Sequence, residues 1–294
     1  MMAGDTIVLG GIPSTFDLYS RAVKSALPVI GAGGDSVPST TLALKNFRVD
    51  RDNLAAYCKV TGLRLTDDLP LTYPFTLVFP IVMKLMVSEG FPFPAIGSVH
   101  AENVIEQYRP ISTTSPLDIE VHAENLREHR KGMLIDVVSE VRVGRELVWR
   151  QVSSFLRQGH TSLSDQPRAV PKSDEVPPPP LRTLRVDQKT ISRYAAVSGD
   201  RNPIHVSTLG AKAFGFPRTI AHGMWSAATI LGTVEGRIPG AVTYSVRFGK
   251  PIVLPATLNL YADRVEHAEA GESGWNLAIR HPKKGYPHLT ATLR

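Results

Sequence analysis

The segment LRVDQKTISRYAAVSG at residues 184–199 is a diverged copy of FRVDRDNLAAYCKVTG at residues 47–62. Six of the sixteen aligned positions are identical, and the offset between the two segments is 137 residues throughout. Each copy is typical of a short strand, an Asp that caps a helix, apolar residues at helical spacing, and a Gly that ends the helix. The chain is therefore predicted to consist of two related halves.

A second pair of segments extends this repeat at an offset of 143 residues, since residues 74–80 align with residues 217–223. Each is followed by a pattern that predicts a long helix, at Ile81–Ser88 in the first half and at Met224–Val234 in the second. Alternating apolar and polar residues then predict strands near 117–121, 134–143, 146–156, 257–261, 274–280 and 289–293. A sheet with one apolar face needs a cover, which the long helix supplies. We therefore predict an α+β fold of two antiparallel sheets, each wrapped around a long helix.

A proline-rich stretch separates the two halves. Residues 177–180 are four consecutive prolines within the segment QPRAVPKSDEVPPPPLR. Such a run is incompatible with a helix or a central strand, so we expect an extended linker that crosses between the halves. The predicted organisation is an N-terminal domain at 1–165, a linker at 166–182 and a C-terminal domain at 183–294.

The composition is that of an ordinary globular protein, with 43% hydrophobic and 20% charged residues among 294. A single cysteine, Cys58, excludes an internal disulfide framework and a multi-thiolate zinc site. The most apolar run, residues 75–87, is too short to span a bilayer. The first ten residues show no basic region ahead of an apolar core. We therefore expect a cytoplasmic protein with no membrane span and no secretory signal.

The formal charge of +6 is distributed unevenly, with −3 in residues 1–147 and +9 in residues 148–294. A basic half favours an anionic partner, such as nucleic acid, a phosphate-bearing cofactor or an acidic carrier protein. The basic residues are scattered, and no cluster is longer than pairs such as Lys283-Lys284. We therefore expect no nucleic-acid partner.

The change of offset from 137 to 143 places six extra residues in the loop after Gly199. This loop carries Asp200, Asn202 and His205. The Asn202-Pro203 pair disfavours helix and predicts an irregular turn, on which the Asp and His side chains can converge. A carboxylate beside a histidine is a usable acid–base pair, because histidine titrates near neutral pH. The alternative is a turn with no catalytic role, for which this sequence is equally suited.

The first half of the chain lacks this set of residues. Leu63 stands where the second half has Asp200, and Pro80, which has no N–H, stands where the second half has Gly223. Gly223 is expected at or near the start of the long helix, where free N–H groups can meet a carbonyl oxygen that gains negative charge. It could instead be a close-packing residue. The joint loss of acid, base and donor favours a functional site in the second half.

Residues 194–205, YAAVSGDRNPIH, resemble the hydratase 2 motif of the MaoC-like (R)-specific enoyl-CoA hydratases and 3-hydroxyacyl-thioester dehydratases. Residues 220–224 and 247–252 resemble the segments that follow this motif in the family. Apart from roughly the first 40 residues, the resemblance extends along the chain to members with two hotdog domains. It is closest to the mycobacterial type of 3-hydroxyacyl-thioester dehydratase, whose N-terminal hotdog lacks the motif. The resemblance implies a hotdog fold in each half.

The resemblance also implies an activity, namely reversible hydration of trans-2-enoyl thioesters and dehydration of (R)-3-hydroxyacyl thioesters in fatty-acid metabolism. It implies that Asp200 and His205 hold and activate a water, that Asn202 supports them, and that the N–H of Gly223 polarises the thioester carbonyl. No cofactor and no metal are expected, since CoA or phosphopantetheine enters only as part of the substrate. Further candidates for substrate binding are Ser198, His222, Lys212, Arg247 and Lys250.

Two other functions remain open at this point: a hotdog acyl thioesterase and a non-catalytic acyl-binding subunit. A thioesterase needs the carbonyl donor but not the Asp-x-Asn-Pro-x-His loop, and an intact Asp200 and His205 argue against a subunit without activity. The partner is expected to be an acyl-CoA or acyl carrier protein thioester, and the assembly a monomeric pseudo-dimer or a homodimer. The apolar stretch at 75–87 predicts a medium to long acyl chain, unless it only forms the core of its own domain.

Overall fold

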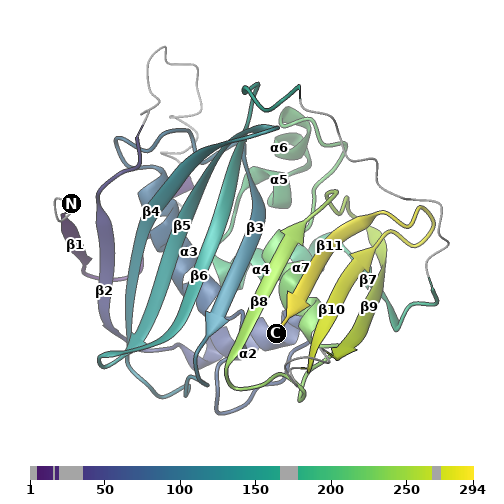
Figure 1. Ribbon diagram of the computed structural model, residues 1–294, viewed down its shortest axis with the longest axis horizontal. Helices are drawn as coiled ribbons and strands as arrows, with labels where there is room; N and C mark the ends of the chain where they lie inside the picture. The colour runs from purple at the N-terminus through teal and green to yellow at the C-terminus, as the bar shows by residue number, and fades with distance from the viewer. Residues whose placement is uncertain (1–4, 16, 20–35, 166–177, 267–272) are drawn as a thin grey trace.

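The computed structural model of the chain describes residues 5–15, 17–19, 36–165, 178–266 and 273–294. Its strands form one sheet of eleven strands in the order β1-β2-β4-β5-β6-β3-β8-β11-β10-β9-β7 (Figure 1). Neighbouring strands are antiparallel except β1 and β2, which are parallel. The strands are β1 (Thr6–Leu9), β2 (Thr41–Phe47), β3 (Ser98–Gln107), β4 (Leu117–His129), β5 (Gly132–Val143), β6 (Glu146–Gln158), β7 (Arg182–Val186), β8 (Val242–Phe248), β9 (Ala256–Glu266), β10 (Ser273–Arg280) and β11 (Pro287–Leu293).

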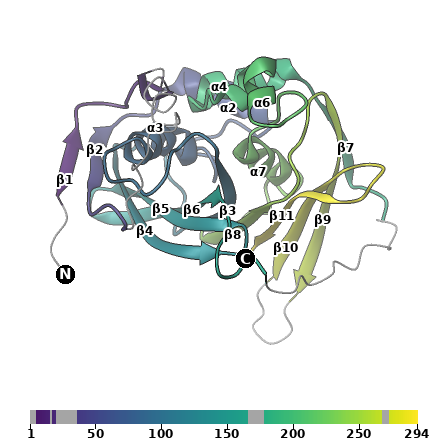
Figure 2. The same cartoon turned by 90° about the horizontal axis from the view of Figure 1, so that it is seen from above.

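The helices lie on one side of the curved sheet in two layers. Helices α3 and α7 lie directly against the inner face of the sheet, and α2 and α4 lie beyond them (Figure 2). The helix bounds are α2 (Arg51–Thr61), α3 (Pro74–Met86), α4 (Gln188–Ser198), α5 (Pro203–Val206), α6 (Thr208–Ala213) and α7 (Gly223–Leu231). The predicted α+β fold, with a sheet wrapped around one long helix in each half, is confirmed.

The two half-sheets are not separate, because β3 of the first half pairs with β8 of the second. In this register Ile105 lies opposite Tyr244, and Asn103 lies opposite Val246. Each of these strands would otherwise be a sheet edge with unpaired backbone N–H and C=O groups. Their pairing satisfies both edges and turns two predicted sheets into one.

The caps of the two shorter helices are as the sequence predicts. Asp50 caps α2, since its side chain accepts hydrogen bonds from the N–H groups of Asp52 and Asn53. Asp187 caps α4 in the same way, and its side chain accepts from the N–H of Thr190. Both helices end at a glycine in the left-handed conformation, with φ of 77° at Gly62 and 73° at Gly199.

The long helix of the first half begins earlier than predicted. Helix α3 starts at Pro74, seven residues before the expected Ile81, and it ends at Met86. Proline suits the first turn of a helix because that turn leaves its N–H groups without intrahelical partners. Pro80 consequently lies inside α3 rather than at its start. In the second half, α7 begins at Gly223, so the two long helices are not equivalent at this point.

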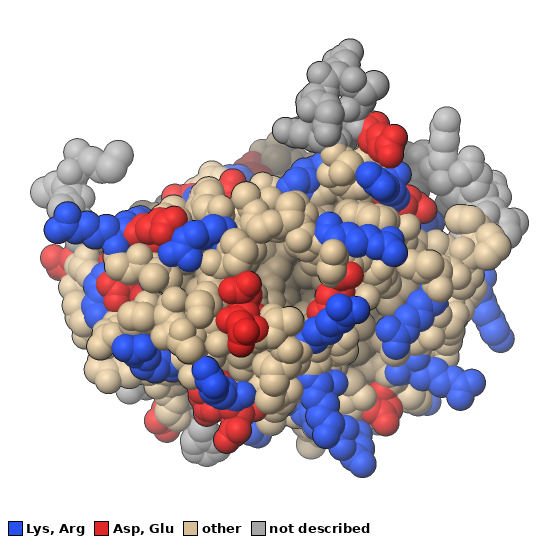
Figure 3. All heavy atoms as spheres, turned by 90° about the horizontal axis from the view of Figure 1, so that it is seen from below, with Lys and Arg blue, Asp and Glu red and all other residues tan. Residues whose placement is uncertain are grey.

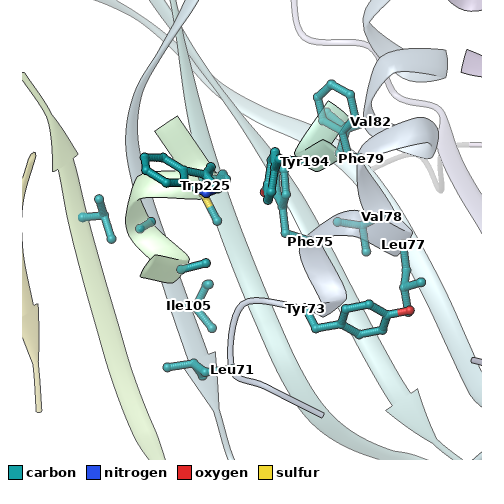
Figure 4. Close-up of a cluster of buried hydrophobic side chains, with 14 of the residues drawn as sticks. Leu71, Tyr73, Phe75, Leu77, Val78, Phe79, Val82, Ile105, Tyr194 and Trp225 are labelled. Atoms are coloured by element: carbon teal, nitrogen blue, oxygen red, sulfur yellow. The ribbon is translucent and has the colours of Figure 1, made fainter. Parts of the chain in front are cut away.

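The two halves interlock through their helices, and their buried apolar side chains form one core. Helix α2 contacts α7, and α4 contacts α3. The indole N–H of Trp225 donates to the carbonyl of Val60 at 3.1 Å. Figure 4 shows Tyr194 of α4 lying between Trp225 of α7 and the side chains of α3. The first half is thus part of the framework that holds the second.

Most of the predicted linker, residues 166–177, lies outside the described residues, and its last residue, Arg182, is the first residue of β7. The domain boundaries therefore stay a prediction. Acidic and basic side chains both lie on the lower face of the molecule, and Lys and Arg predominate over its right part (Figure 3). Within the described part of the chain, no helix has both the length and the apolar character needed to cross a membrane.

Candidate active site

The loop after Gly199 leads into a short helix that the sequence does not predict. Pro203 is the first residue of α5, and the Asn202 side chain caps that helix by accepting from the N–H of Ile204 at 3.3 Å. The prediction of an irregular turn at Asn202-Pro203 is therefore wrong for His205, which lies on α5. The reason is that an Asn followed by Pro is a favourable helix start as well as a turn signal.

Asp200 and His205 converge as predicted. The Oδ2 atom of Asp200 lies 4.0 Å from Nε2 of His205, and both side chains are largely buried. Nδ1 of His205 lies 2.8 Å from the carbonyl oxygen of Ile220, which can only accept a hydrogen bond. Nδ1 therefore carries the proton, and Nε2 presents a lone pair toward the carboxylate. The two atoms are too far apart for a direct hydrogen bond and near enough to contact one water molecule together.

His222 holds the backbone of this loop. Its Nε2 atom donates to the carbonyl oxygen of Asp200 at 2.9 Å, and its ring centroid lies 3.8 Å from that of His205. Burial, assisted by His205, lowers the pKa of His222 to about 3, so the ring is neutral at neutral pH. The sequence suggested His222 as a substrate contact, whereas the structure gives it a contact to the loop that carries Asp200.

The electrostatics of the pair suit proton chemistry. Burial by itself would raise the pKa of the Asp200 carboxyl, but His222, His205 and a hydrogen bond from Tyr19 outweigh burial and hold the pKa below its usual range. Burial lowers the pKa of His205 and Asp200 raises it. The effect of burial is the larger, so the pKa of His205 lies below its usual value. At neutral pH the site therefore combines a carboxylate with a neutral imidazole.

The start of α7 supplies the third feature of the site. Gly223 is the first residue of α7, and the preceding residue, His222, makes no side-chain cap to that helix. The first-turn N–H groups have no intrahelical partners and lie at the positive end of the helix dipole. A Cβ atom at Gly223 would lie 2.9 Å from the Phe248 ring, so the position is also one of close packing. Both interpretations of Gly223 made from the sequence thus fit the geometry.

Asp200, His205 and His222 also offer potential metal-ligand atoms within 4.8 Å of one another, and within the described ranges they are the group of three that does so. Nε2 of His222 carries a proton that it donates to the Asp200 carbonyl, so it has no lone pair for a metal. Of the atoms that face one another here, Asp200 Oδ2 and the Nε2 atoms of the two histidines, a carboxylate and one imidazole keep a lone pair, fewer than the three protein ligands of a typical catalytic zinc site. The donor set as arranged favours proton transfer over metal binding.

The other predicted substrate-binding residues are dispersed. The buried hydroxyl of Ser198 accepts from the N–H of Asp200 at 3.2 Å, so it shapes the loop. Lys212 lies on α6, which contacts α5. Arg247 pairs with Glu102 and its side chain is 79% exposed. The Lys250 ammonium lies 4.3 Å from the ring centroid of Tyr286. The structure does not gather these basic residues around the Asp200–His205 pair.

Two residues near the site were missed by the sequence analysis. The hydroxyl of Tyr19 donates to Oδ1 of Asp200 at 2.6 Å across 181 residues of chain. The ring of His100 on β3 stacks on Phe155, with 4.9 Å between centroids, and lies tilted against Phe248, with 5.0 Å between centroids. Burial lowers the pKa of His100 to about 4, so it too is neutral at neutral pH. No local sequence pattern signals either contact, because each joins segments far apart in the chain.

The chain is similar to known proteins over most of its length. The model of the MaoC like domain matches residues 171–276, which include the Asp200–His205 loop and the start of α7. The 3-hydroxyacyl-thioester dehydratase X of Mycobacterium tuberculosis is 50% identical over 282 residues, covering 96% of this chain and 98% of that protein. The peroxisomal enoyl-CoA hydratase 2 of Arabidopsis thaliana is 29% identical over 189 residues, covering 60% of this chain and 61% of that protein.

Solved structures give the same relationship. A crystal structure of HtdX from Mycobacterium tuberculosis matches with a TM-score of 0.75 at 50% identity, covering 88% of this chain and 99% of that one. A MaoC-like dehydratase from Phytophthora capsici, at 18% identity and a TM-score of 0.67, shares the fold. The extent of these matches, together with the loop and helix start described above, shows that the chain belongs to the family of MaoC-like dehydratases.

Proposed function

We propose that the protein catalyses the reversible hydration of trans-2-enoyl thioesters, which in reverse is the dehydration of (R)-3-hydroxyacyl thioesters. The observation that carries this proposal is the facing pair of Asp200 Oδ2 and His205 Nε2, 4.0 Å apart, close to the uncapped start of α7. The names of the relatives from Mycobacterium tuberculosis and Arabidopsis thaliana support the same reaction class. The (R) configuration follows from that kinship.

The proposed reaction uses a water held between the carboxylate of Asp200 and the lone pair of His205. As the water oxygen attacks C3, one of its protons passes to this pair, and the C2=C3 electron pair moves toward the thioester carbonyl. The same pair returns a proton to C2, so that one water is added in total. Dehydration follows the same path backwards, with the hydroxyl leaving from C3 as water.

Negative charge develops on the thioester oxygen during this reaction and must be met by a donor placed in advance. The N–H of Gly223 is suited to this role, because it lies in the first turn of a helix without a side-chain cap. Such a donor contributes most when the surroundings exclude water. The Phe248 ring packed against Gly223 excludes water on one side of the glycine.

The first half of the chain is proposed to support the site and to shape the acyl pocket. Leu63, the counterpart of Asp200, is a buried apolar residue. The first half contributes Phe75, His100 and Phe155 to a set of contacting rings that continues to Phe248 beside Gly223. An acyl chain that follows these rings would leave water for an apolar wall, which favours medium to long chains.

The thioester is proposed to carry CoA or phosphopantetheine, with no other cofactor, and the chain to work in the cytoplasm as a monomeric pseudo-dimer or a homodimer. Among the basic candidates, Lys212 has the best position for a phosphate contact, because its helix α6 contacts α5, on which His205 lies. Arg247, by contrast, already pairs with Glu102 on an exposed part of the surface.

A single assay separates this function from the two alternatives. Mixing the protein with crotonyl-CoA should lower the enoyl absorbance without releasing thiol. A thioesterase would release free thiol, and a non-catalytic binding subunit would change neither signal. Release of thiol at the rate of enoyl loss, or no reaction with any enoyl-CoA from four to sixteen carbons, would contradict the proposal.

A further inference from the structure

The segment before residue 20 reaches the candidate site through Tyr19. The Tyr19 side chain is 9% exposed, and its hydroxyl donates to Oδ1 of Asp200 at 2.6 Å. A distance this short is typical of a hydroxyl bound to a charged carboxylate. The N–H of Asn202 donates to the same oxygen, Oδ1 of Asp200, at 3.2 Å. The hydroxyl is therefore built into the loop that carries Asp200.

A second contact joins the same segment to the same loop. A Cβ atom at Gly199 would lie 2.9 Å from the Cγ2 methyl of Thr15, so Thr15 packs directly on the glycine that ends α4. Leu18, next to Tyr19, is buried in the hydrophobic core. The segment thus contacts two consecutive residues of the loop, Gly199 and Asp200, and the buried side chain of Leu18 fixes it to the hydrophobic core.

The two oxygens of Asp200 have different surroundings. Oδ1 accepts from the Tyr19 hydroxyl at 2.6 Å and from the N–H of Asn202 at 3.2 Å. Oδ2 lies 4.0 Å from Nε2 of His205 and 3.9 Å from Nε2 of His222. Both distances are too long for a hydrogen bond, so neither ring donates to Oδ2. Tyr19 therefore engages the oxygen that points away from His205 and leaves the other oxygen for a water.

Five parts of the fold contribute ionisable groups that interact with Asp200. They are Tyr19 of the N-terminal segment, His100 of β3, Tyr194 of α4, His205 of α5 and His222 at the start of α7. All of them are neutral at neutral pH, because burial raises the pKa of both tyrosines and lowers the pKa of the three histidines. The pKa of Asp200 is held down first by His222 and His205, and the hydrogen bonds that its carboxylate accepts from Tyr19 and from the N–H of Asn202 add to this effect.

We propose that Tyr19 is a positioning residue of the active site, whose hydroxyl fixes Oδ1 of Asp200 so that Oδ2 and His205 share the reacting water. This inference rests on the proposed hydratase function and extends it to a segment that the sequence analysis left without a role. Tyr19 acts through Asp200 and makes no contact with the thioester. Its loss should therefore lower turnover while leaving substrate binding nearly unchanged.

The test is the Tyr19→Phe variant of the full chain, assayed with crotonyl-CoA across pH. Loss of a hydrogen bond to a charged group should lower kcat about tenfold to a hundredfold, with KM changed less than about threefold. The acid limb of the kcat profile should move about one to two pH units upward, because the carboxylate loses a donor that favours its charged form. A merely structural role would not move this limb.

The matched control is Tyr108→Phe, which removes a tyrosine hydroxyl that donates to a carboxylate, Glu106, at 3.2 Å on an exposed part of the surface. Its kcat and pH profile should equal those of the wild type. The ring of Tyr19 is kept in Tyr19→Phe, so thermal unfolding should stay within a few degrees of the wild type and exclude gross misfolding.

A double variant decides whether Tyr19 acts through Asp200. In the Asp200→Asn background the Tyr19→Phe change should leave the residual rate unchanged within about twofold, since the carboxylate it positions is gone. An equal loss of rate in both backgrounds would overturn the proposal, as would a Tyr19→Phe variant with wild-type kcat and an unmoved acid limb. A wild-type protein inactive on every enoyl thioester would instead refute the proposed function.

Discussion

Nδ1 of His205 lies 2.8 Å from the carbonyl oxygen of Ile220, and this contact determines which nitrogen of the ring faces Asp200. A carbonyl cannot donate, so the proton resides on Nδ1 and the lone pair of Nε2 points into the site. Ile220, which sets the tautomer of His205, is fifteen positions away in sequence and lies just before His222 and Gly223. The acid–base pair and the start of α7 are held as one unit.

The variants Asp200→Asn and His205→Gln should each fold normally and lose at least about 10²-fold in hydratase rate, the usual scale of acid–base catalysis. Both changes keep the size and polarity of the side chain. Because the two side chains act on one water, the double variant should lose less than the product of the single losses. Steady-state rates with crotonyl-CoA measure this, and a near wild-type rate for either single variant would refute the assignment.

Paired variants can separate the role of the Gly223 N–H as a hydrogen-bond donor from the steric effect of adding a side chain at this position. Replacement by Ala alone would push Phe248, whose ring would lie 2.9 Å from the new Cβ atom. The double variant Gly223→Ala with Phe248→Ala makes room and keeps the N–H, whereas Gly223→Pro with Phe248→Ala makes room and removes it. Pro suits this position, since it is the first of α7 and the preceding His222 has φ of −65° and ψ of 138°.

The double variant with Pro at position 223 should have a kcat about 10²–10³-fold lower than the double variant with Ala there, which is the usual effect of removing one oxyanion donor. Far-ultraviolet circular dichroism of the two double variants should be the same. Equal rates for these two double variants would show that the N–H of Gly223 does not donate to the thioester oxygen, and that the glycine is only a packing residue.

His222 predicts how stability depends on pH. Its pKa is about 3 in the folded protein, below the value of about 6.5 in an unfolded chain. As the pH falls below about 6.5, the unfolded chain binds a proton that the folded protein rejects, so the free energy of unfolding falls by about 1.4 kcal/mol per pH unit. Stability from this group is therefore complete above about pH 6.5 and is lost toward pH 3.

Urea unfolding of the wild type and of His222→Gln between pH 7 and pH 4 measures this effect. The glutamine amide can still donate to the Asp200 carbonyl, so the variant should fold and show a shallower dependence on pH. His160→Gln serves as the control, because the His160 side chain is 76% exposed and should leave the dependence unchanged. Identical pH slopes for wild type and His222→Gln would contradict the prediction.

The parts of the fold that the sequence predicted are those with local causes. The Asp caps and Gly ends of α2 and α4 are each encoded within a few residues, so their bounds follow from capping chemistry alone. The strand alternation has the same local origin. The start of α3 was misplaced because an apolar run such as Pro74–Pro80 does not distinguish a buried helix from a buried strand.

The parts that were missed depend on contacts between distant segments. The pairing of β3 with β8 joins residues more than 130 positions apart, and no local pattern states which strand edges will meet. In the site, the comparison of two copies was enough to single out Asp200, Asn202, His205 and Gly223. The contact of Tyr19, which was missed, and the loop contact of His222, which was expected to bind substrate instead, form only when the N-terminal segment, the loop after α4 and α7 are packed together.

If only the second half of the chain carries out the chemistry, the Asp68→Ala variant should keep its hydratase activity. Asp68 belongs to the carboxylate pair Asp67-Asp68 that follows Leu63, the counterpart of Asp200, and its backbone forms an isolated bridge with Ser112. Its kcat should stay within about twofold of the wild type. A large fall in kcat without a matching fall in thermal stability would mean that the first half takes part in the chemistry and that the alignment of the two copies is misplaced.

Acyl-chain preference tests the proposed role of the first half most directly. Helix α3 is buried almost throughout and contacts β4 and β5, as a domain core would, yet its Phe75 also stacks with His100 toward Phe248. If an acyl chain follows these rings, each buried methylene contributes about 0.8 kcal/mol, so four extra carbons should raise kcat/KM by about two decades. The measurement is kcat/KM for enoyl-CoA substrates from four to sixteen carbons. A profile that peaks at four carbons and then falls steadily would leave the first half as a scaffold, whereas a rise toward medium or long chains that is blunted in Phe75→Ala would place the chain against α3.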